Sequence, residues 1–250
     1  MKKILIIIPA YNEEKNILRT YNEIKKYNEK NKTKYDVIVV NDGSTDDTEI
    51  ILQTNNIPHV CLPANLGIGG AVQTGYKYAA YNDYDVAIQY DGDGQHDINY
   101  IKNIINPILN DETDFVIGSR FVEDISKFKT TKSRRAGINI ISFFIKMMCG
   151  KKIYDTTSGF RAANKEIIKL FAKEYPQEYP EPITNLELVK RGYRVEEIAV
   201  NMRERQGGVS SIHAWKTVYY MLNVCLCLIV NILLVYHNLL AILDVDGVWL

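Results

Sequence analysis

Two aspartates separated by a single glycine, Asp91 and Asp93, are the residues of this chain best suited to chemistry. They follow an apolar, strand-like segment and lie in the stretch DGDGQHD, residues 91–97. Carboxylate oxygens are the ligands that Mg²⁺ and Mn²⁺ prefer, and such ions usually contact substrate phosphates as well. A solvated turn is the alternative, because Asp-Gly is a common turn pair. The spacing predicts a divalent metal site, and His96 is a weaker candidate for contact with the metal or a phosphate.

A third carboxylate, Asp42, follows another strand-like segment in the stretch NDGSTDDT, residues 41–48. It can accept hydrogen bonds from a nucleotide base or a ribose hydroxyl, or it can cap the next helix. The glycine-rich stretch at residues 65–71 lacks the Lys and Ser/Thr of a P-loop. The first strand is followed by PAYNEE, residues 9–14, and not by a dinucleotide-binding fingerprint. These patterns argue against a P-loop NTPase and against an NAD enzyme.

An alternation of strand-like and helix-like segments must position these side chains. β-rich apolar runs occur at residues 3–9, 35–40, 59–62, 86–90 and 115–118. Helical patterns separate them, first in a helix that Asn12 would cap and then at residues 50–52, 70–81 and 98–109. This order predicts a parallel sheet with helices on both faces, whose ligands bind at the carboxyl ends of the strands. Beyond residue 120 we expect helices at 138–149, 165–172 and 183–191, a loop at 175–182 and a strand at 193–202.

The charges of the chain are unevenly distributed along its 250 residues. The chain is 46% apolar and 24% charged, so it can bury a core, and its net charge of zero argues against nucleic acid as a partner. Residues 1–125 nevertheless carry a net charge of −7 and residues 126–216 a net charge of +9. The four cysteines contain no CxxC pair, which favours a reducing, cytoplasmic compartment. The basic second half indicates a polyanionic partner or a membrane surface.

Two apolar features favour the membrane. Residues 217–243 contain no Asp, Glu, Lys or Arg, and as a helix they would extend about 40 Å, enough to cross a bilayer. Because Asn and His residues interrupt this segment, an interfacial or oligomer-forming helix is the alternative. Residues 126–154 combine eight basic residues with a Phe-Phe and a Met-Met pair, which suits an anionic leaflet. The positive-inside rule then places residues 1–216 in the cytoplasm.

The order of six motifs resembles that of the family 2 glycosyltransferases. The motifs are IPAYNEE (8–14), NDGSTDDT (41–48), NLGIGGAVQTGY (65–76), DGDGQHD (91–97), GSR (118–120) and TSGFRA (157–162). The resemblance covers residues 3–212 and is greatest to the branch that contains dolichol-phosphate mannosyltransferase and bacterial surface-polysaccharide transferases. It implies a Rossmann-like α/β fold, the nucleotide-diphospho-sugar transferase or GT-A fold, with a mostly parallel sheet. We expect this catalytic domain at residues 1–212 and a C-terminal hydrophobic helix within residues 213–250.

The resemblance also implies roles for individual residues. Asp91 and Asp93, with Gln95 nearby, would hold Mg²⁺ or Mn²⁺ at the diphosphate, where Arg120 would add a positive charge. The nucleotide base and ribose would contact the residues Pro9, Tyr11, Glu13 and Asp42. For a sugar hydroxyl acceptor, Asp155 is the first candidate general base and Glu181 the second. A lipid phosphate acceptor would need positive charge instead, which the chain could supply from Arg134, Arg135, Arg203 and Arg205.

The function that these patterns favour is that of an inverting glycosyltransferase at the cytoplasmic face of the cell membrane. It would move a sugar from a nucleoside diphosphate sugar, with UDP the favoured nucleotide, to a polyprenyl phosphate or a lipid-linked glycan. A polysaccharide transferase that extends a glycan at a sugar hydroxyl is the nearest alternative, and a non-catalytic membrane subunit is a further one. The C-terminal helix would be the contact for a homo-oligomer or a small membrane partner.

Overall fold

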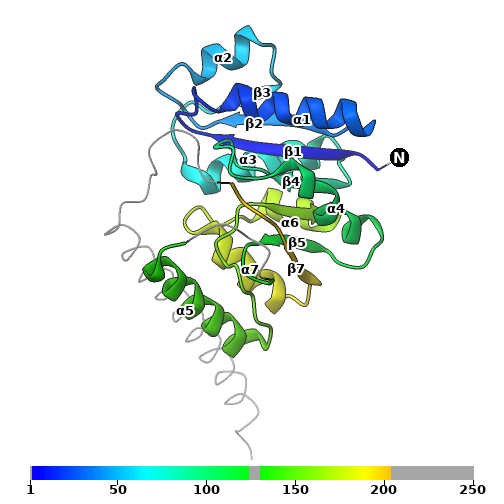
Figure 1. The fold of residues 1–250 in the computed structure, drawn as a ribbon, viewed down its shortest axis with the longest axis vertical. Coiled ribbons are helices and arrows are strands. Elements are labelled where there is room, and N and C mark those ends of the chain that lie inside the picture. Colours follow the sequence, from blue (N-terminus) through cyan, green and yellow to red (C-terminus); the bar gives the residue numbers. More distant parts are fainter. Residues whose placement is uncertain (1, 124–129, 204–250) are drawn as a thin grey trace, which may run out of the picture.

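A seven-stranded sheet runs through the part of the chain that the structure describes, residues 2–123 and 130–203 of a computed structural model (Figure 1). The strand order is β3-β2-β1-β4-β6-β5-β7. The strands are β1 (Ile4–Ala10), β2 (Asp36–Asn41), β3 (His59–Cys61), β4 (Val86–Gln89), β5 (Phe115–Ser119), β6 (Arg161–Asn164) and β7 (Val195–Ala199). All neighbouring pairs are parallel except those of β6, which is antiparallel to both β4 and β5. The predicted α/β fold with a mostly parallel sheet is therefore confirmed.

Helices cover both faces of this sheet (Figure 1). They are α1 (Ile17–Asn31), α2 (Thr48–Thr54), α3 (Gly67–Tyr81), α4 (Ile101–Leu109), α5 (Lys132–Cys149), α6 (Lys165–Lys173) and α7 (Pro180–Lys190), with a short 3₁₀ turn at Ile98–Tyr100. Strand β1 is buried along its whole length, and its alternate side chains enter two cores. Ile6 and Ile8 pack with residues of α1 and α4, whereas Leu5 and Ile7 pack with residues of α3 and α6. Burial on both faces explains why β1 has a continuous apolar sequence and not an alternating one.

The antiparallel strand β6 is the main feature that the sequence pattern did not predict. Its four residues, RAAN, carry little β propensity, and the sequence pattern predicts no strand there. Their strand conformation comes from the register, in which Ile88 and Val116 both pair with Ala162. Because β6 runs against its neighbours, its first residue lies at the same edge as the carboxyl ends of β4 and β5. The segment TSGF that precedes β6 is thereby brought to the edge where ligands bind such sheets.

Several predicted helix starts were wrong, and α3 begins at Gly67, three residues before its expected start. Asn12 does not cap α1, since it adopts a positive φ of 56° in a turn and the helix begins at Ile17. Helix α5 begins at Lys132, six residues earlier than expected, and its cap is the hydroxyl of Thr131. Helix α7 begins at Pro180, inside the expected loop, because proline fits the first position of a helix, where no N–H partner is needed.

No helix among residues 2–123 and 130–203 is long and apolar enough to cross a membrane. The segment for which we expect a C-terminal hydrophobic helix, residues 213–250, lies outside the described residues.

Candidate functional site

The polar motifs of the chain gather at one edge of the sheet. Strands β2, β1, β4 and β5 run in the same direction, so their carboxyl ends meet at that edge. Asp42 directly follows β2, Asp91 lies two residues after β4, and Arg120 directly follows β5. The parallel order predicted this juxtaposition for Asp42 and Asp91, and β6 adds the TSGF segment to the same edge.

The loops after β1 and β2 are tied together by side chains. The Asn12 N–H donates to Ser44 Oγ over 3.0 Å, and the Thr45 N–H donates to Asn12 Oδ1 over 2.8 Å. The Glu13 N–H donates to Thr48 Oγ1 over 2.9 Å. Asparagine tolerates the left-handed backbone at position 12 better than most residues, which explains its presence there. These three hydrogen bonds join the loops that follow β1 and β2.

The three residues expected to contact the base and ribose from the β1 end differ in exposure. Tyr11 is 46% exposed and can reach a ligand. Pro9 is buried as the second-last residue of β1. Glu13 is also buried, and its carboxylate accepts a hydrogen bond of 2.8 Å from the Asn16 side chain. Of the three side chains, that of Tyr11 is the one that the structure leaves open to solvent.

The carboxylate of Asp42 is buried directly after β2 and is held there by a backbone hydrogen bond. Its side chain is only 3% exposed, and its Oδ1 accepts the Leu66 N–H over 2.8 Å. Burial raises its pKa, while hydrogen bonds from the backbone of Leu66 and Gly67 act in the opposite direction. Gly43 allows the close approach of this loop, because a Cβ there would lie 2.7 Å from the carbonyl carbon of Ala64. The glycine-rich stretch thus belongs to the start of α3, where it fixes Asp42.

The chemistry of Asp91 and Asp93 suits a divalent metal, and the metal site that their spacing predicts stays a prediction. Both side chains are partly exposed at the end of β4, and they offer the hard oxygen ligands that Mg²⁺ and Mn²⁺ prefer. Burial tends to raise the pKa of Asp91, but the nearby His96, Gln89 and Arg161 outweigh this effect and hold the pKa below its usual value. Within the described part of the chain, no three His, Cys, Asp or Glu side chains form a metal cluster. Two carboxylates are nevertheless enough for Mg²⁺, which usually completes its coordination with waters and substrate phosphates.

Gln95 and Asp93 are linked through the backbone. The Gln95 N–H donates to Asp93 Oδ1 over 3.0 Å, which closes the turn between them. The Gln95 carbonyl in turn accepts the N–H of Arg203 over 2.8 Å, so the turn is anchored to the segment after β7.

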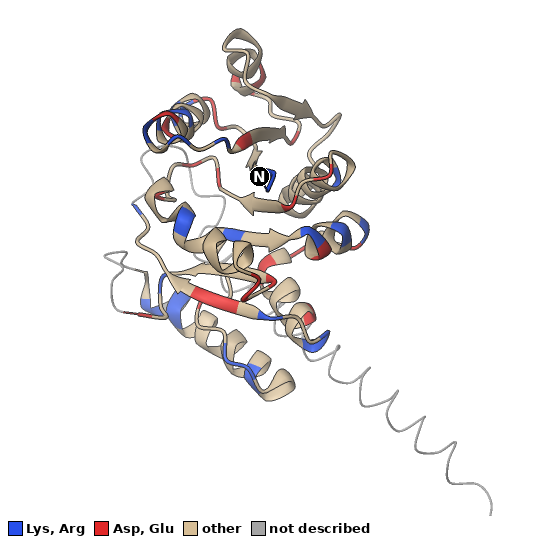
Figure 2. Cartoon of the chain, turned by 90° about the vertical axis from the view of Figure 1, so that its right-hand side faces the viewer, with Lys and Arg blue, Asp and Glu red and all other residues tan. Residues whose placement is uncertain are grey.

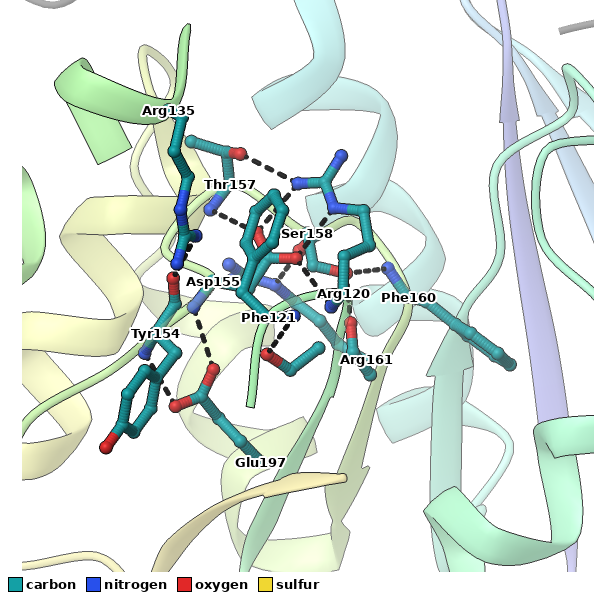
Figure 3. Close-up of polar contacts among 12 residues, drawn as sticks. Arg120, Phe121, Arg135, Tyr154, Asp155, Thr157, Ser158, Phe160, Arg161 and Glu197 are labelled. Carbon is teal, nitrogen blue, oxygen red and sulfur yellow. Dashed lines mark hydrogen bonds and ion pairs between the residues drawn. The ribbon is translucent and has the colours of Figure 1, made fainter. Parts of the chain in front are cut away.

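Arg120 is bound to Asp155 by a buried, two-pronged ion pair (Figure 3). Its Nε and Nη2 atoms donate to Asp155 Oδ2 and Oδ1, each over 2.7 Å, and its backbone N–H donates to Oδ2 over 3.0 Å. Nη2 also donates to Thr157 Oγ1 over 3.0 Å. The arrangement holds the guanidinium at the end of β5, beside the TSGF segment.

The surroundings of Asp155 are unfavourable for a general base. Its side chain is completely buried, and Arg120 contacts both of its oxygens. Burial tends to raise its pKa, but the charge of Arg120 and the hydrogen bonds to the carboxylate dominate and lower it. Glu197 accepts the N–H groups of Tyr154 and Asp155 over 2.7 and 2.8 Å and so fixes the backbone behind the carboxylate (Figure 3). The geometry suits Asp155 to positioning Arg120, and its predicted role as a base stays a prediction.

The pKa of Glu181 is raised, whereas that of Asp155 is lowered, so Glu181 is the more basic of the two candidate bases. It lies in the first turn of α7, and burial raises the pKa of its carboxyl. The charge of Arg161 counteracts this rise, while the charge of Asp91 adds to it. Arg161 is itself buried and donates to the Ser158 carbonyl and to Thr184 Oγ1 over 2.6 and 2.7 Å.

The candidate phosphate-binding arginines are not all brought together. Arg134 and Arg135 lie in the first turn of α5, and the Arg135 guanidinium stacks on the Phe121 ring at 3.8 Å from its centroid. Arg203 instead forms ion pairs of 3.1 Å with Glu23 and Asp97. A phosphate would have to compete with these two carboxylates. Arg205 lies outside the described residues.

Sequence reasoning assigned no role to several residues that shape the site. Glu197 and Phe121 carry no motif signal of their own. Gly159 and Arg161 belong to the TSGFRA motif. The motif marks this segment as part of the family pattern, but it does not indicate which residues Gly159 and Arg161 contact.

Comparison with known proteins places these features in a family. The sequence profile described as "Glycosyl transferase family 2" matches residues 5–171. A UDP-N-acetylglucosamine–dolichyl-phosphate N-acetylglucosaminyltransferase of Methanococcus voltae is 34% identical over 69% of this chain and 74% of its own length. A dolichyl-phosphate β-glucosyltransferase of Dictyostelium discoideum is 29% identical over 81% of this chain and 67% of its own. Among solved structures, glucosyl-3-phosphoglycerate synthase from Mycobacterium tuberculosis, in complex with Mn²⁺, UDP-glucose and phosphoglyceric acid, matches with a TM-score of 0.66. The match is 18% identical in sequence and covers 90% of this chain and 80% of that one, so it supports the GT-A fold.

Proposed function

This chain belongs to glycosyl transferase family 2, and we propose that it transfers a sugar from a nucleoside diphosphate sugar to a polyprenyl phosphate. UDP is the favoured nucleotide, and the transfer inverts the anomeric carbon. The observation that carries the proposal is the meeting of Asp42, the Asp91–Asp93 pair and Arg120 at one edge of the sheet. These groups suit, in turn, a nucleotide base, a metal-bound diphosphate and the negative charge that the leaving group gains.

A divalent cation belongs to this proposal. Asp91 and Asp93 would hold Mg²⁺ or Mn²⁺, with Gln95 nearby, and the ion would offset the charge that develops on the departing diphosphate. The donor set supports this assignment, as does the Mn²⁺ and UDP-glucose complex of the structural neighbour. Asp42 would accept a hydrogen bond from the base, while Tyr11 would face the nucleotide from the β1 loop.

A lipid phosphate is the acceptor that the relatives favour. The two relatives described above transfer different sugars, and both names specify dolichyl phosphate as the acceptor. A phosphate acceptor is already anionic, so it needs cations nearby more than a base. Arg120, Arg134 and Arg135 are the described candidates at this end of the molecule, and the proposal adds Arg205. A lipid acceptor also requires access to the membrane, which we assign to α5 and to a C-terminal hydrophobic helix within residues 213–250.

The catalytic unit of this proposal is residues 1–212, at the cytoplasmic face of the membrane. The C-terminal segment would provide the contact in a homo-oligomer or with a small membrane partner.

A glycan hydroxyl, free or on a lipid-linked glycan, is the second acceptor to consider. A hydroxyl must lose a proton during transfer, and Glu181 is a base whose pKa is already raised by burial. Under this alternative the replacement of Glu181 by Gln would abolish turnover. Under transfer to a lipid phosphate the same variant would keep most of its activity.

A donor screen tests the proposal. The purified chain is incubated with UDP-glucose, UDP-N-acetylglucosamine, UDP-galactose and GDP-mannose, each with Mg²⁺ or Mn²⁺ and with or without polyprenyl phosphate, and nucleotide release is measured. We expect one donor to give metal-dependent release of its nucleoside diphosphate that increases with the lipid. Equal release without the lipid would overturn the acceptor assignment. Activity retained in Asp93→Asn would overturn the metal assignment.

A further inference from the structure

A buried histidine and a glycine enclose the carboxylate of Asp91. The His96 side chain is 2% exposed, and its Nε2 lies 3.1 Å from Asp91 Oδ2. On another side the same carboxylate lies against the Cα of Gly159, where a Cβ would come within 2.5 Å of Oδ2 and 2.8 Å of Oδ1. The two contacts come from motifs that are more than sixty residues apart in the sequence, the DGDGQHD stretch and the TSGFRA stretch.

The His96 ring is packed against two aromatic side chains, those of Phe160 and Tyr90. It stacks on Phe160 with a centroid distance of 4.9 Å and an interplanar angle of 25°, and it meets the edge of Tyr90 at 5.2 Å. The Tyr90 hydroxyl donates to the His96 carbonyl over 2.7 Å, which fixes the backbone as well. A ring packed against two aromatic side chains has little freedom to move, so it can define the orientation of the carboxylate beside it.

The polar surroundings of the two His96 ring nitrogens point to Asp91. Apart from Asp91, neither ring nitrogen has a polar partner there. Burying a polar group without a partner costs free energy, so phenylalanine could be buried against these two rings at a lower cost in free energy. In the tautomer that carries its proton on Nε2, the ring has an N–H group whose nitrogen lies 3.1 Å from Asp91 Oδ2.

We propose that His96 and Gly159 are positioning residues that set the orientation of the Asp91 carboxylate toward the divalent cation. The inference rests on the proposed function, in which Asp91 is a metal ligand. His96 places its Nε2 3.1 Å from the carboxylate, and Gly159 supplies the space in which the carboxylate lies. Groups of this kind behind a metal ligand typically change metal affinity by about 10- to 100-fold when they are replaced. Gly159 does not have a positive φ, so alanine fits its backbone and the effect of a methyl group there would come from the contact with Asp91.

Binding of Mn²⁺ in the presence of UDP, measured by titration with electron paramagnetic resonance detection, tests this proposal. His96→Phe keeps the aromatic stack but removes the nitrogen, and we expect its Mn²⁺ affinity to fall by about tenfold or more. His96→Gln can offer an amide N–H and should recover part of the loss. Gly159→Ala should also weaken Mn²⁺ binding, because its methyl group displaces the carboxylate. His59→Phe, at the sheet edge in β3, is the matched control and should bind Mn²⁺ like the unmodified chain.

Thermal unfolding of each variant separates positioning from a purely structural role. A structural role predicts loss of stability with unchanged Mn²⁺ affinity in the folded protein, and that result would overturn the inference. Asp93→Asn separates this failure from that of the proposed function. If Asp93→Asn loses Mn²⁺ and the folded His96→Phe and Gly159→Ala variants do not, the positioning inference alone is wrong. If Asp93→Asn binds Mn²⁺ like the unmodified chain, the metal site and the inference that depends on it are both wrong.

Discussion

Arg120 and Asp155 form a closed ion pair in which two guanidinium nitrogens face two carboxylate oxygens, each over 2.7 Å, with both side chains buried. The two residues are 35 positions apart in the sequence, and the pair links the end of β5 to the segment that precedes β6. The carboxylate therefore serves to fix a cation at the ligand-binding edge of the sheet.

Replacing Arg120 with Lys should destabilise the fold. Lysine keeps the charge but cannot make the two-pronged contact, and breaking a buried pair costs about 3–5 kcal/mol. Because the charge stays, we expect a loss near the lower end of this range, measured by urea unfolding. Arg191→Lys is the matched control, because its pair with Glu174 is exposed and should contribute less than about 1 kcal/mol. Equal losses of unfolding free energy in the two variants would show that the buried Arg120–Asp155 pair stabilises the fold no more than the exposed Arg191–Glu174 pair does.

The stabilising effect of Asp155 should depend on pH in one direction. Its pKa in the folded state is lowered, so its charge contributes stability above the unfolded-state pKa of about 3.9. That contribution is lost as the pH falls through the still lower folded-state pKa. The difference in unfolding free energy between the unmodified chain and Asp155→Asn should thus be full at neutral pH and shrink below pH of about 4. A difference that stays constant down to acid unfolding would contradict the assignment.

Replacing Asp42 with Asn should weaken nucleotide binding. The amide oxygen can still accept the Leu66 N–H, so the loop stays in place while the charge that would face the base is lost. A hydrogen bond to a charged group contributes about 1.5–3 kcal/mol, so UDP affinity measured by calorimetry should fall about tenfold or more. Asp36→Asn, at the opposite end of β2, removes an equivalent charge and should leave the affinity unchanged. Retention of UDP affinity in Asp42→Asn would remove Asp42 from the nucleotide site.

Helix α5 should bind anionic vesicles through its exposed apolar face. Ile140, Phe143 and Met147 are 49%, 63% and 57% exposed and share one side of the helix. The same helix carries four basic residues, Lys132, Arg134, Arg135 and Lys146, and Figure 2 colours the Lys and Arg positions of the ribbon blue. Burying a phenylalanine contributes about 1.5–3 kcal/mol, so Phe143→Ser should reduce vesicle affinity about tenfold or more in a flotation assay.

The matched control for this helix is Tyr81→Ser, which removes an aromatic side chain that is 91% exposed on α3. It should leave vesicle binding intact. Binding that is insensitive to both Phe143→Ser and added salt would contradict the assignment of α5 to the membrane surface.

The sheet and the positions of its carboxylates could be predicted from sequence because both depend on local patterns. Continuous apolar runs indicate buried parallel strands, and motifs that end such runs must meet at one edge. The prediction failed where tertiary contacts decide the structure. Strand β6 gains its conformation from two neighbours and not from its own RAAN sequence. Asn12 looked like a helix cap, but its side chain bonds to Thr45 in another loop.

The site shows the same division. Residue type and spacing made Asp91 and Asp93 candidate metal ligands, but no local pattern could indicate that Arg120 contacts both oxygens of Asp155 or that Gly159 lies against Asp91. The residues in these contacts are far apart in the sequence, and their separation along the chain does not predict the distance between them in the fold. They explain why the first candidate for a base lies in an unsuitable environment, while the second, Glu181, has a raised pKa.

Transfer of a radiolabelled sugar to polyprenyl phosphate tests the central claim most directly. The purified chain is incubated with the donor selected by the screen, polyprenyl phosphate and Mg²⁺ or Mn²⁺, and the organic extract is counted and identified by mass spectrometry. We predict a lipid that carries one sugar on a single phosphate, formed only with the metal ion and not by Asp93→Asn. Label that enters only glycans, or that enters lipid equally without a divalent cation, would contradict the account.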